Sequence, residues 1–254
     1  MLRLEDKTPP WFLKSMNRTI AITGASSEIG KAIISWLDKT CDLFILQCNK
    51  NHSELEKYIS EISTKSNIIK ADFSMDDDIS NFCKEIVKAD VLINAAAVTK
   101  TDLLPMLPDK EINNMIAVNI SATIKTCQAV IPYMISHRQG IIINFSSIAA
   151  SRGNRGQTVY SGTKGFIESF SRSLASEIGS RGVRVNCIAP GPIDAGSLKS
   201  LLSYANDEIM NSILSKRLGT PEDVAALVKF LCSGESEFIN GQVIHIDGGF
   251  IKGV

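Results

Sequence analysis

The sequence predicts a doubly wound α/β domain, in which helices cover both faces of a seven-stranded parallel sheet. Seven short apolar runs alternate with amphipathic segments of helical length. Apolar runs of this kind suit strands that are covered on both faces. A chain of 254 residues that is 44% hydrophobic and 21% charged can also bury one large core. We therefore expect a single domain, residues 18–254, after an N-terminal extension, residues 1–17.

The predicted elements follow from these runs and from helix-end signals. A helix is predicted to begin at Thr220-Pro221-Glu222-Asp223, where Thr caps, Pro takes the first turn and the acids face the helix dipole. The long irregular region 191–218 is expected to be a mobile cover over a substrate site. The predicted strands are 19–22, 43–46, 67–69, 91–93, 141–143, 183–188 and 243–246, and the longest predicted helices are 108–137, open to interruption, and 158–179.

Charge and hydropathy exclude several classes of function. Lys and Arg number 27, as do Asp and Glu, and no basic or acidic run stands out. We therefore expect no nucleic-acid partner. No stretch approaches the ~20 uninterrupted apolar residues of a membrane span. The leader carries charges throughout and has no apolar run of signal-peptide length, so the expected location is the cytoplasm.

The cysteines give no sign of a metal site or a disulfide framework. All six are scattered, without a CxxC pair, and the three histidines do not stand at metal-ligand spacing. We expect buried free thiols in a reducing compartment and no bound metal.

The stretch TGASSEIG, residues 23–30, joins the first predicted strand to a helical segment. A glycine-bearing turn in this place presents backbone N–H groups and the positive end of a helix to a phosphate. Gly24 permits the tight turn and Gly30 the close packing of helix on strand, whereas Glu28 stands where such loops usually have glycine. An ordinary strand–helix turn is the alternative that this string alone leaves open.

The end of the second predicted strand indicates which nucleotide such a loop would take. An NAD site usually has Asp or Glu there, for the ribose hydroxyls of the adenosine. This chain has Asn49 and Lys50, and Lys50 supplies a cation that suits a 2′-phosphate, so we expect NADP(H). A merely solvated Lys50 is the alternative.

Tyr160 and Lys164 are spaced i, i+4, so on a helix they share one face. A nearby ammonium stabilises a phenolate and is expected to lower the phenol pKa, which makes Tyr160 a usable proton donor. Ser147 follows a predicted strand, at the edge of the sheet where α/β active sites form. Asn119 is a polar residue in an apolar helical stretch, and a side chain that bonds a backbone carbonyl is its alternative role.

These residues, taken in order, resemble the short-chain dehydrogenase/reductase family from about residue 18 to the C-terminus, which implies a Rossmann-type fold. The residues that carry the resemblance are TGASSEIG, Asp72, Asn94 in INAAA, Asn119, Ser147, Tyr160-x-x-x-Lys164 and Pro190-Gly191.

The resemblance implies a catalytic role for each of four residues. Tyr160 would protonate a carbonyl oxygen as hydride arrives from the nicotinamide, and Ser147 would hold that oxygen. Lys164 would lower the pKa of Tyr160 and bind the nicotinamide ribose, and Asn119 would anchor a water that links Lys164 to solvent. This is hydride transfer with general acid catalysis and needs no metal.

The resemblance also implies a set of cofactor contacts. Asp72 would meet the adenine, Asn94 would support the cofactor side of the sheet edge, and Ile193 would contact the carboxamide through its backbone. The complete expected set is Gly24, Ser26, Ser27, Ile29, Asn49, Lys50, Asp72, Phe73, Asn94, Tyr160, Lys164, Pro190, Gly191 and Ile193.

Within the family, the chain is most similar to the 3-oxoacyl-acyl carrier protein reductases. The features are GNRGQ before Tyr160, RLGTPEDVA at 217–225 and INGQVIHIDGG at 239–249. Arg138 and Arg181 match positions where such reductases place cations for an acidic carrier protein. A cation favoured by the dipole near a helix C-terminus is the alternative for each arginine.

Three positions depart from the family pattern: Glu28, the alanines at 95 and 97, and Ala195, where a Thr hydroxyl is often found. Each is expected to weaken cofactor binding, and none removes a group that performs chemistry. The first hypothesis is NADPH-dependent reduction of a 3-oxoacyl thioester, carrier-bound or free, by a homotetramer or homodimer. The second is action on another ketone or alcohol, such as a sugar, polyol, steroid or secondary metabolite. The third is a nucleotide-binding scaffold without turnover.

Overall fold

The computed structural model describes residues 18–196 and 210–250, so the leader and the middle of the predicted cover lie outside the described residues. One sheet holds seven parallel strands in the order β3-β2-β1-β4-β5-β6-β7. The predicted sheet is confirmed. The strands are β1 (Thr19–Thr23), β2 (Leu43–Cys48), β3 (Lys65–Lys70), β4 (Val91–Asn94), β5 (Gly140–Phe145), β6 (Val183–Pro190) and β7 (Val243–Ile246).

Helices connect the strands, as the amphipathic segments predict. The predicted helix 108–137 is interrupted by one π-helical turn, Ala117–Ser121, between α4 and α5. The helices are α1 (Glu28–Leu37), α2 (His52–Ile59), α3 (Asp76–Glu85), α4 (Asp109–Ile116), α5 (Ala122–His137), α6 (Thr158–Ile178) and α8 (Pro221–Leu231).

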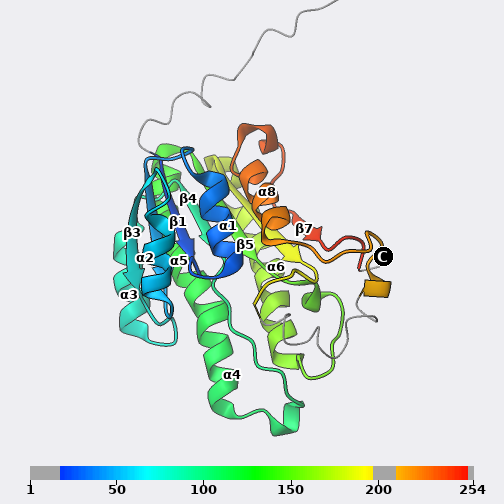
Figure 1. Ribbon diagram of the computed structural model, residues 1–254. Coiled ribbons are helices and arrows are strands. Elements are labelled where there is room, and N and C mark those ends of the chain that lie inside the picture. Colours follow the sequence, from blue (N-terminus) through cyan, green and yellow to red (C-terminus); the bar gives the residue numbers. More distant parts are fainter. Residues whose placement is uncertain (1–17, 197–209, 251–254) are drawn as a thin grey trace, which may run out of the picture.

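Helices cover both faces of the sheet, because alternate strand residues face opposite sides. Ile20 and Ile22 of β1 belong to the core layer that α1 and α8 cover, and Figure 1 shows these two helices side by side. Ala21, between them, belongs to the layer of α3, α5 and α6. These two apolar layers hold the sheet in place, so its carboxyl edge is a rigid base for a site.

α8 begins where the sequence predicts, and its predicted cap is formed. The Thr220 hydroxyl accepts a hydrogen bond from the Asp223 N–H, and the Asp223 carboxylate accepts one from the Thr220 N–H. Arg217 also pairs with this carboxylate and holds the pKa of Asp223 at about 2. The capping box therefore fixes the first turn of a helix whose Val224, Ala225, Val228 and Leu231 lie in the core.

The strand order reverses between β1 and β4. β1 leads out to β2 and β3 on one side, and β4 begins the other half of the sheet, with Thr23 beside Asn94 at their carboxyl ends. In doubly wound sheets ligands bind at the carboxyl edge where the order reverses. A site is therefore expected between the loops that follow β1 and β4.

Two further features concern composition. Within residues 18–196 and 210–250, no helix is long and apolar enough to cross a membrane. All six cysteines are free; four are buried as expected, but Cys41 and Cys83 are only partly buried. Burial raises the pKa of the Cys127 and Cys187 thiols to about 12.

Candidate active site

The TGASSEIG loop leads directly from β1 into α1. Gly24 adopts φ +69°, and a Cβ there would lie 2.8 Å from the Ala96 nitrogen, so only glycine fits this turn. The Ser27 hydroxyl accepts a hydrogen bond from the Gly30 N–H at 3.0 Å and donates one to the Gly24 carbonyl at 2.8 Å. The loop is therefore locked at both ends, with the N-terminus of α1 at the carboxyl edge.

Gln47 holds this loop from below, a role that the sequence reasoning missed. It is buried in β2, where its Oε1 accepts a hydrogen bond from the Gly24 N–H at 2.8 Å. Its Nε2 donates to the Ala71 carbonyl at 2.7 Å. Gln47 thus ties the TGASSEIG loop to the end of β3. The sequence does hold a sign of this role, because Gln47 is a polar residue near the end of an otherwise apolar strand.

The residues expected around adenosine gather at the ends of β2 and β3. Asp72 accepts hydrogen bonds from the Ser74 N–H and hydroxyl, which together with Asn49 and the charge of Lys50 lower the pKa of Asp72. The Phe73 side chain packs in the core against Phe82 and leaves only its backbone for a ligand. Asp72 is a negative charge near Lys50, so Lys50 is less isolated than the sequence indicates.

This edge fits a dinucleotide. A Cβ on Gly30 would lie 2.5 Å from the Gly24 carbonyl oxygen, so the loop lies directly against the first turn of α1. The N-terminus of a helix favours an anion. Gly191, after β6, has no room for a side chain either, because a Cβ would lie 2.5 Å from the Asp247 Cβ. Ile193 then pairs with Gly219 and fixes the backbone of this segment.

Ser147, Tyr160 and Lys164 meet at the carboxyl end of β5. Ser147 lies two residues beyond the strand in extended backbone, and Tyr160 and Lys164 share one face of α6. The Tyr160 hydroxyl makes a hydrogen bond with Ser147. The Lys164 Nζ lies 5.7 Å from the centre of the Tyr160 ring and donates to the Phe145 carbonyl at 2.8 Å. The structure thus brings together the three groups that the sequence places apart.

The expected lowered pKa of Tyr160 is not found: its pKa lies above the usual value, because burial outweighs any stabilisation of the phenolate by Lys164. Burial raises the pKa of Tyr160, and only the hydrogen bond with Ser147 acts against it. The Lys164 ammonium lies over the ring and is held by a backbone carbonyl, so the cost of removing the phenolate from water prevails. Burial also lowers the pKa of Lys164 to about 8. Tyr160 is therefore a neutral phenol that has a proton to give.

Asn119 lies in the π-helical turn and is almost fully buried. Its Oδ1 accepts from the Val98 N–H at 2.8 Å, and its Nδ2 donates to the Val98 carbonyl at 2.9 Å and to the Thr163 hydroxyl at 3.0 Å. The backbone-bonding role weighed above is thus present. A relay water would have to bond the main-chain carbonyl of Asn119, and that relay stays a prediction.

Asn94 is also engaged inside the protein. Its Nδ2 donates to Asn144 Oδ1 at 2.9 Å, and its Oδ1 accepts from the Thr126 hydroxyl at 2.9 Å. The side chain therefore holds β4 to β5 and to α5, which suits a supporting role at the sheet edge rather than direct contact with a ligand.

Ser146 and Glu168 join β5 to α6 beside the catalytic residues, and the sequence reasoning named neither. The Ser146 hydroxyl makes contacts of 3.1 Å to the Lys164 carbonyl and 3.0 Å to Glu168 Oε1. The Glu168 side chain is 12% exposed. Glu168 could have been found from the sequence, because it stands four residues after Lys164 and so shares its helix face.

Arg138 and Arg181 lie at the other edge of the sheet, where β5 and β6 begin. Arg138 ends α5, and Arg181 ends a short 3₁₀ turn after α6. Both are therefore cations at helix ends, which was the alternative to a docking role. Arg138 Nη2 approaches the Ser180 carbonyl at 3.5 Å, which brings the two arginine segments together. They are separated from Ser147 by the length of β5, roughly 20 Å.

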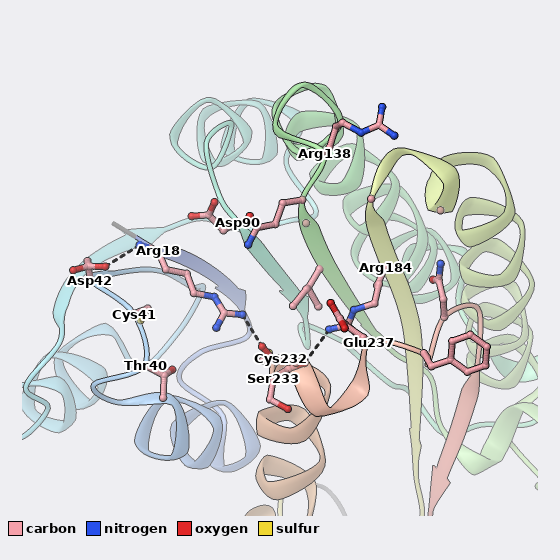
Figure 2. A pocket seen from close by; sticks show the side chains of 18 of the residues that line it. Arg18, Thr40, Cys41, Asp42, Asp90, Arg138, Arg184, Cys232, Ser233 and Glu237 are labelled. Carbon is pink, nitrogen blue, oxygen red and sulfur yellow. Dashed lines mark hydrogen bonds between the residues drawn. The ribbon is translucent and has the colours of Figure 1, made fainter. Parts of the chain in front are cut away.

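A cavity of about 1090 Å³ lies at this amino edge. Figure 2 shows the side chains that line it, Arg138 among them. Arg184 donates to the carbonyls of Leu231 and Ser236, and Arg18 to that of Cys232. These guanidinium groups cap the end of α8, which explains their presence without a ligand. The cavity is not the candidate active site, because it lies at the edge opposite Tyr160.

Known proteins share this sequence and fold. A family model described as enoyl-(acyl carrier protein) reductase matches residues 24–251. The 3-oxoacyl-[acyl-carrier-protein] reductase FabG of Chlamydia muridarum is 35% identical over 241 residues, which cover 92% of this chain and 97% of that protein.

Two solved structures share the whole fold. A putative NAD(P)-dependent gluconate 5-dehydrogenase from Beutenbergia cavernae, with bound NADP, has a TM-score of 0.88 and 26% identity, over 93% of this chain and 97% of that one. A putative betaketoacyl-ACP reductase has a TM-score of 0.83 and 25% identity, over 91% and 96%. With the Ser147–Tyr160–Lys164 site at the carboxyl edge, these likenesses show that the chain belongs to the short-chain dehydrogenase/reductase family of NAD(P)-using oxidoreductases.

Proposed function

We propose that the protein uses NADPH to reduce a 3-oxoacyl thioester, carried on an acyl carrier protein, to the 3-hydroxyacyl thioester. The observation that carries a reductase is the phenol of Tyr160, which keeps its proton beside Ser147 and Lys164. The thioester is supported by relatives named 3-oxoacyl-[acyl-carrier-protein] reductase at 34–35% identity. Cytoplasmic location and a homotetramer or homodimer belong to the same proposal.

The site residues divide the chemistry among them. NADPH, when bound, supplies the hydride that reduces the C3 carbonyl carbon. The hydroxyls of Ser147 and Tyr160 hold the carbonyl oxygen, and Tyr160 donates its proton to that oxygen as the alkoxide forms. The Lys164 ammonium then stabilises the phenolate that is left. A proton from solvent, relayed past Lys164 and Asn119, restores the phenol.

Lys50 supports NADPH over NADH. It follows β2 at the adenosine end, where an NAD site would carry an acid, and Asp72 lies close enough to act on its charge. Lys50→Gln should weaken NADPH binding and leave NADH binding unchanged, because only NADPH carries the 2′-phosphate. A titration with both nucleotides measures this, and equal loss for the two would contradict the assignment.

The test of the reaction is a substrate panel with NADPH, followed at the nicotinamide absorbance. We expect oxidation of NADPH with an acetoacetyl thioester and loss of nearly all of that rate in Tyr160→Phe, which keeps the ring but has no proton to give. The Phe variant must keep the wild-type melting temperature for this comparison. Full activity of Tyr160→Phe would overturn the mechanism.

A sugar-derived ketone is the second candidate, because one solved neighbour is a putative gluconate 5-dehydrogenase. The same panel therefore includes a keto-gluconate. A higher kcat/KM for the sugar acid than for the thioester would replace the proposed substrate but retain the mechanism. Absence of turnover with every ketone, despite bound NADPH, would favour the non-catalytic scaffold.

A further inference from the structure

Glu28 contacts a segment that lies far along the chain. Its Oε2 accepts a hydrogen bond of 2.6 Å from the backbone N–H of Gly196. Glu28 is the first residue of α1, directly after β1, whereas Gly196 follows the carboxyl end of β6. Because β4 and β5 lie between these two strands, the contact crosses the carboxyl edge of the sheet.

This contact lies on the path that a dinucleotide takes. In a doubly wound sheet the diphosphate sits at the N-terminus of the first helix, and the rest of the molecule extends across the point where the strand order reverses. Here the first helix is α1, so a dinucleotide that extends past β4 would approach Lys164. The Glu28 carboxylate is thus attached to the helix end that a diphosphate needs.

The Glu28 carboxylate also uses donors that suit a diphosphate. Gly196 has φ +54°, and among the described residues a Cβ there would meet no atom within 4 Å, so there is room beside this backbone. A backbone N–H beside a helix N-terminus favours any anion, whether carboxylate or phosphate. Ala195, the residue before Gly196, has no side-chain hydroxyl that could donate a hydrogen bond to the diphosphate instead.

We propose, on the basis of the NAD(P) site assigned above, that Glu28 sets the affinity for the cofactor diphosphate. Its carboxylate holds the Gly196 N–H in place of a phosphate oxygen and repels the diphosphate by its charge. Binding of the cofactor must therefore break or distort the Glu28–Gly196 hydrogen bond. The glycine usual at this position would impose neither cost.

Glu28→Gln tests this proposal, because glutamine keeps an acceptor for the Gly196 N–H and loses only the charge. We expect the Kd for NADPH to fall about tenfold at low ionic strength. This is the size of effect expected when the repulsion between one surface charge and a nearby diphosphate is removed. The gain should shrink at high salt, which screens the repulsion. Nicotinamide fluorescence measures binding directly, without turnover.

Glu54→Gln is the matched control. Glu54 is an exposed acid that pairs with Lys31 of α1, so this variant removes one negative charge from the same neighbourhood and leaves Gly196 untouched. We expect its Kd to change less than about twofold, since an exposed charge away from the ligand is screened. Equal tightening in both variants would overturn the proposal in favour of a general effect of net charge.

Two further outcomes separate this inference from the proposed function. NADH carries the same diphosphate, so Glu28→Gln should tighten NADH as well even if NADPH proves the wrong cofactor. An unchanged or weaker affinity for both nucleotides in Glu28→Gln would overturn the role of Glu28, while reduction that depends on Tyr160 would still stand. Conversely, a failed reductase assay leaves the binding result unaffected.

Discussion

Lys164 is a buried ammonium. Burial lowers its pKa to about 8, whereas burial raises the pKa of Tyr160, so the phenol keeps its proton across the neutral range. Reduction needs the phenol proton and the charged lysine together. We therefore expect kcat/KM for reduction to be constant below pH of about 8 and to fall above it, as Lys164 loses its charge.

A pH–rate profile for kcat/KM measures this fall at high pH, because kcat/KM reports the ionisation of groups in the free enzyme. Lys164→Arg keeps a cation at every pH in question. Any activity that this variant retains should therefore show no fall near pH 8. A wild-type profile that falls with decreasing pH would contradict the assignment of the charged form.

Gln47 provides a second prediction, for the phosphate loop. Gln47→Met fits the space of the side chain but leaves the Gly24 N–H and the Ala71 carbonyl without their partners. Buried polar groups without partners cost about 1–3 kcal/mol each, so the free energy of unfolding should fall by at least about 1 kcal/mol. Urea unfolding measures this. Gln47→Glu, which keeps the acceptor for Gly24, should bind the cofactor better than Gln47→Met, and the reverse order would contradict the role.

The sequence alone could predict Ser147, Tyr160 and Lys164, because their spacing and their place at a strand end are visible without coordinates. It could not show where Glu28 points. That direction depends on Gly196, which approaches from 168 positions further along the chain. The pKa of Tyr160 was also out of reach, since it follows from burial rather than from the i, i+4 pair.

α8 is the element whose boundary the sequence predicts best. Thr220, Pro221 and Asp223 form the cap that their residue types indicate. Thr220→Ala removes the hydroxyl that accepts from the Asp223 N–H, and we expect a loss of about 1 kcal/mol in the free energy of unfolding. Thr220→Ser, which retains a hydroxyl, should keep most of that free energy. A thermal melt measures both, and an unchanged midpoint for Thr220→Ala would show that the cap contributes nothing here.

The π-helical turn between α4 and α5 is the element that the pattern does not foresee. Hydrophobic periodicity predicts the segment 108–137 and leaves it open to interruption, but it does not show where a turn with one extra residue lies. The turn matters because it carries Asn119, whose amide bonds Val98 on one side and Thr163 on the other. A local irregularity thus joins the segment after β4 to the catalytic helix α6.

At the scale of the molecule, seven apolar runs were enough to predict a parallel sheet and the edge at which a site forms. They did not reveal which predicted residues would end up at the opposite edge. Arg138 and Arg181 precede β5 and β6, whereas Ser147 follows β5, so the expected carrier-docking residues and the active site face away from each other. The acyl group of a carrier bound at Arg138 must therefore reach either the far edge of the same chain or the active site of another copy.

Charge reversal tests the docking itself. Arg138→Glu with Arg181→Glu should raise KM for an acyl group on an acidic carrier protein and leave KM for a small acetoacetyl thioester unchanged, because only the carrier meets the arginines. Rates with both substrates measure this. If both KM values rise alike, the arginines act on the fold rather than on docking.

Mixed assemblies then show which copy is served. Chains with Tyr160→Phe are co-expressed with chains that carry the two Arg→Glu changes, so no chain has both docking and catalysis. If the carrier docks on a neighbour, the mixture should recover about a quarter of the wild-type rate with the carrier substrate, because half the chains keep Tyr160 and half their neighbours keep the arginines. Docking and catalysis on one chain would give no recovery. As the control, a chain with all three changes mixed with wild type should retain activity under either arrangement.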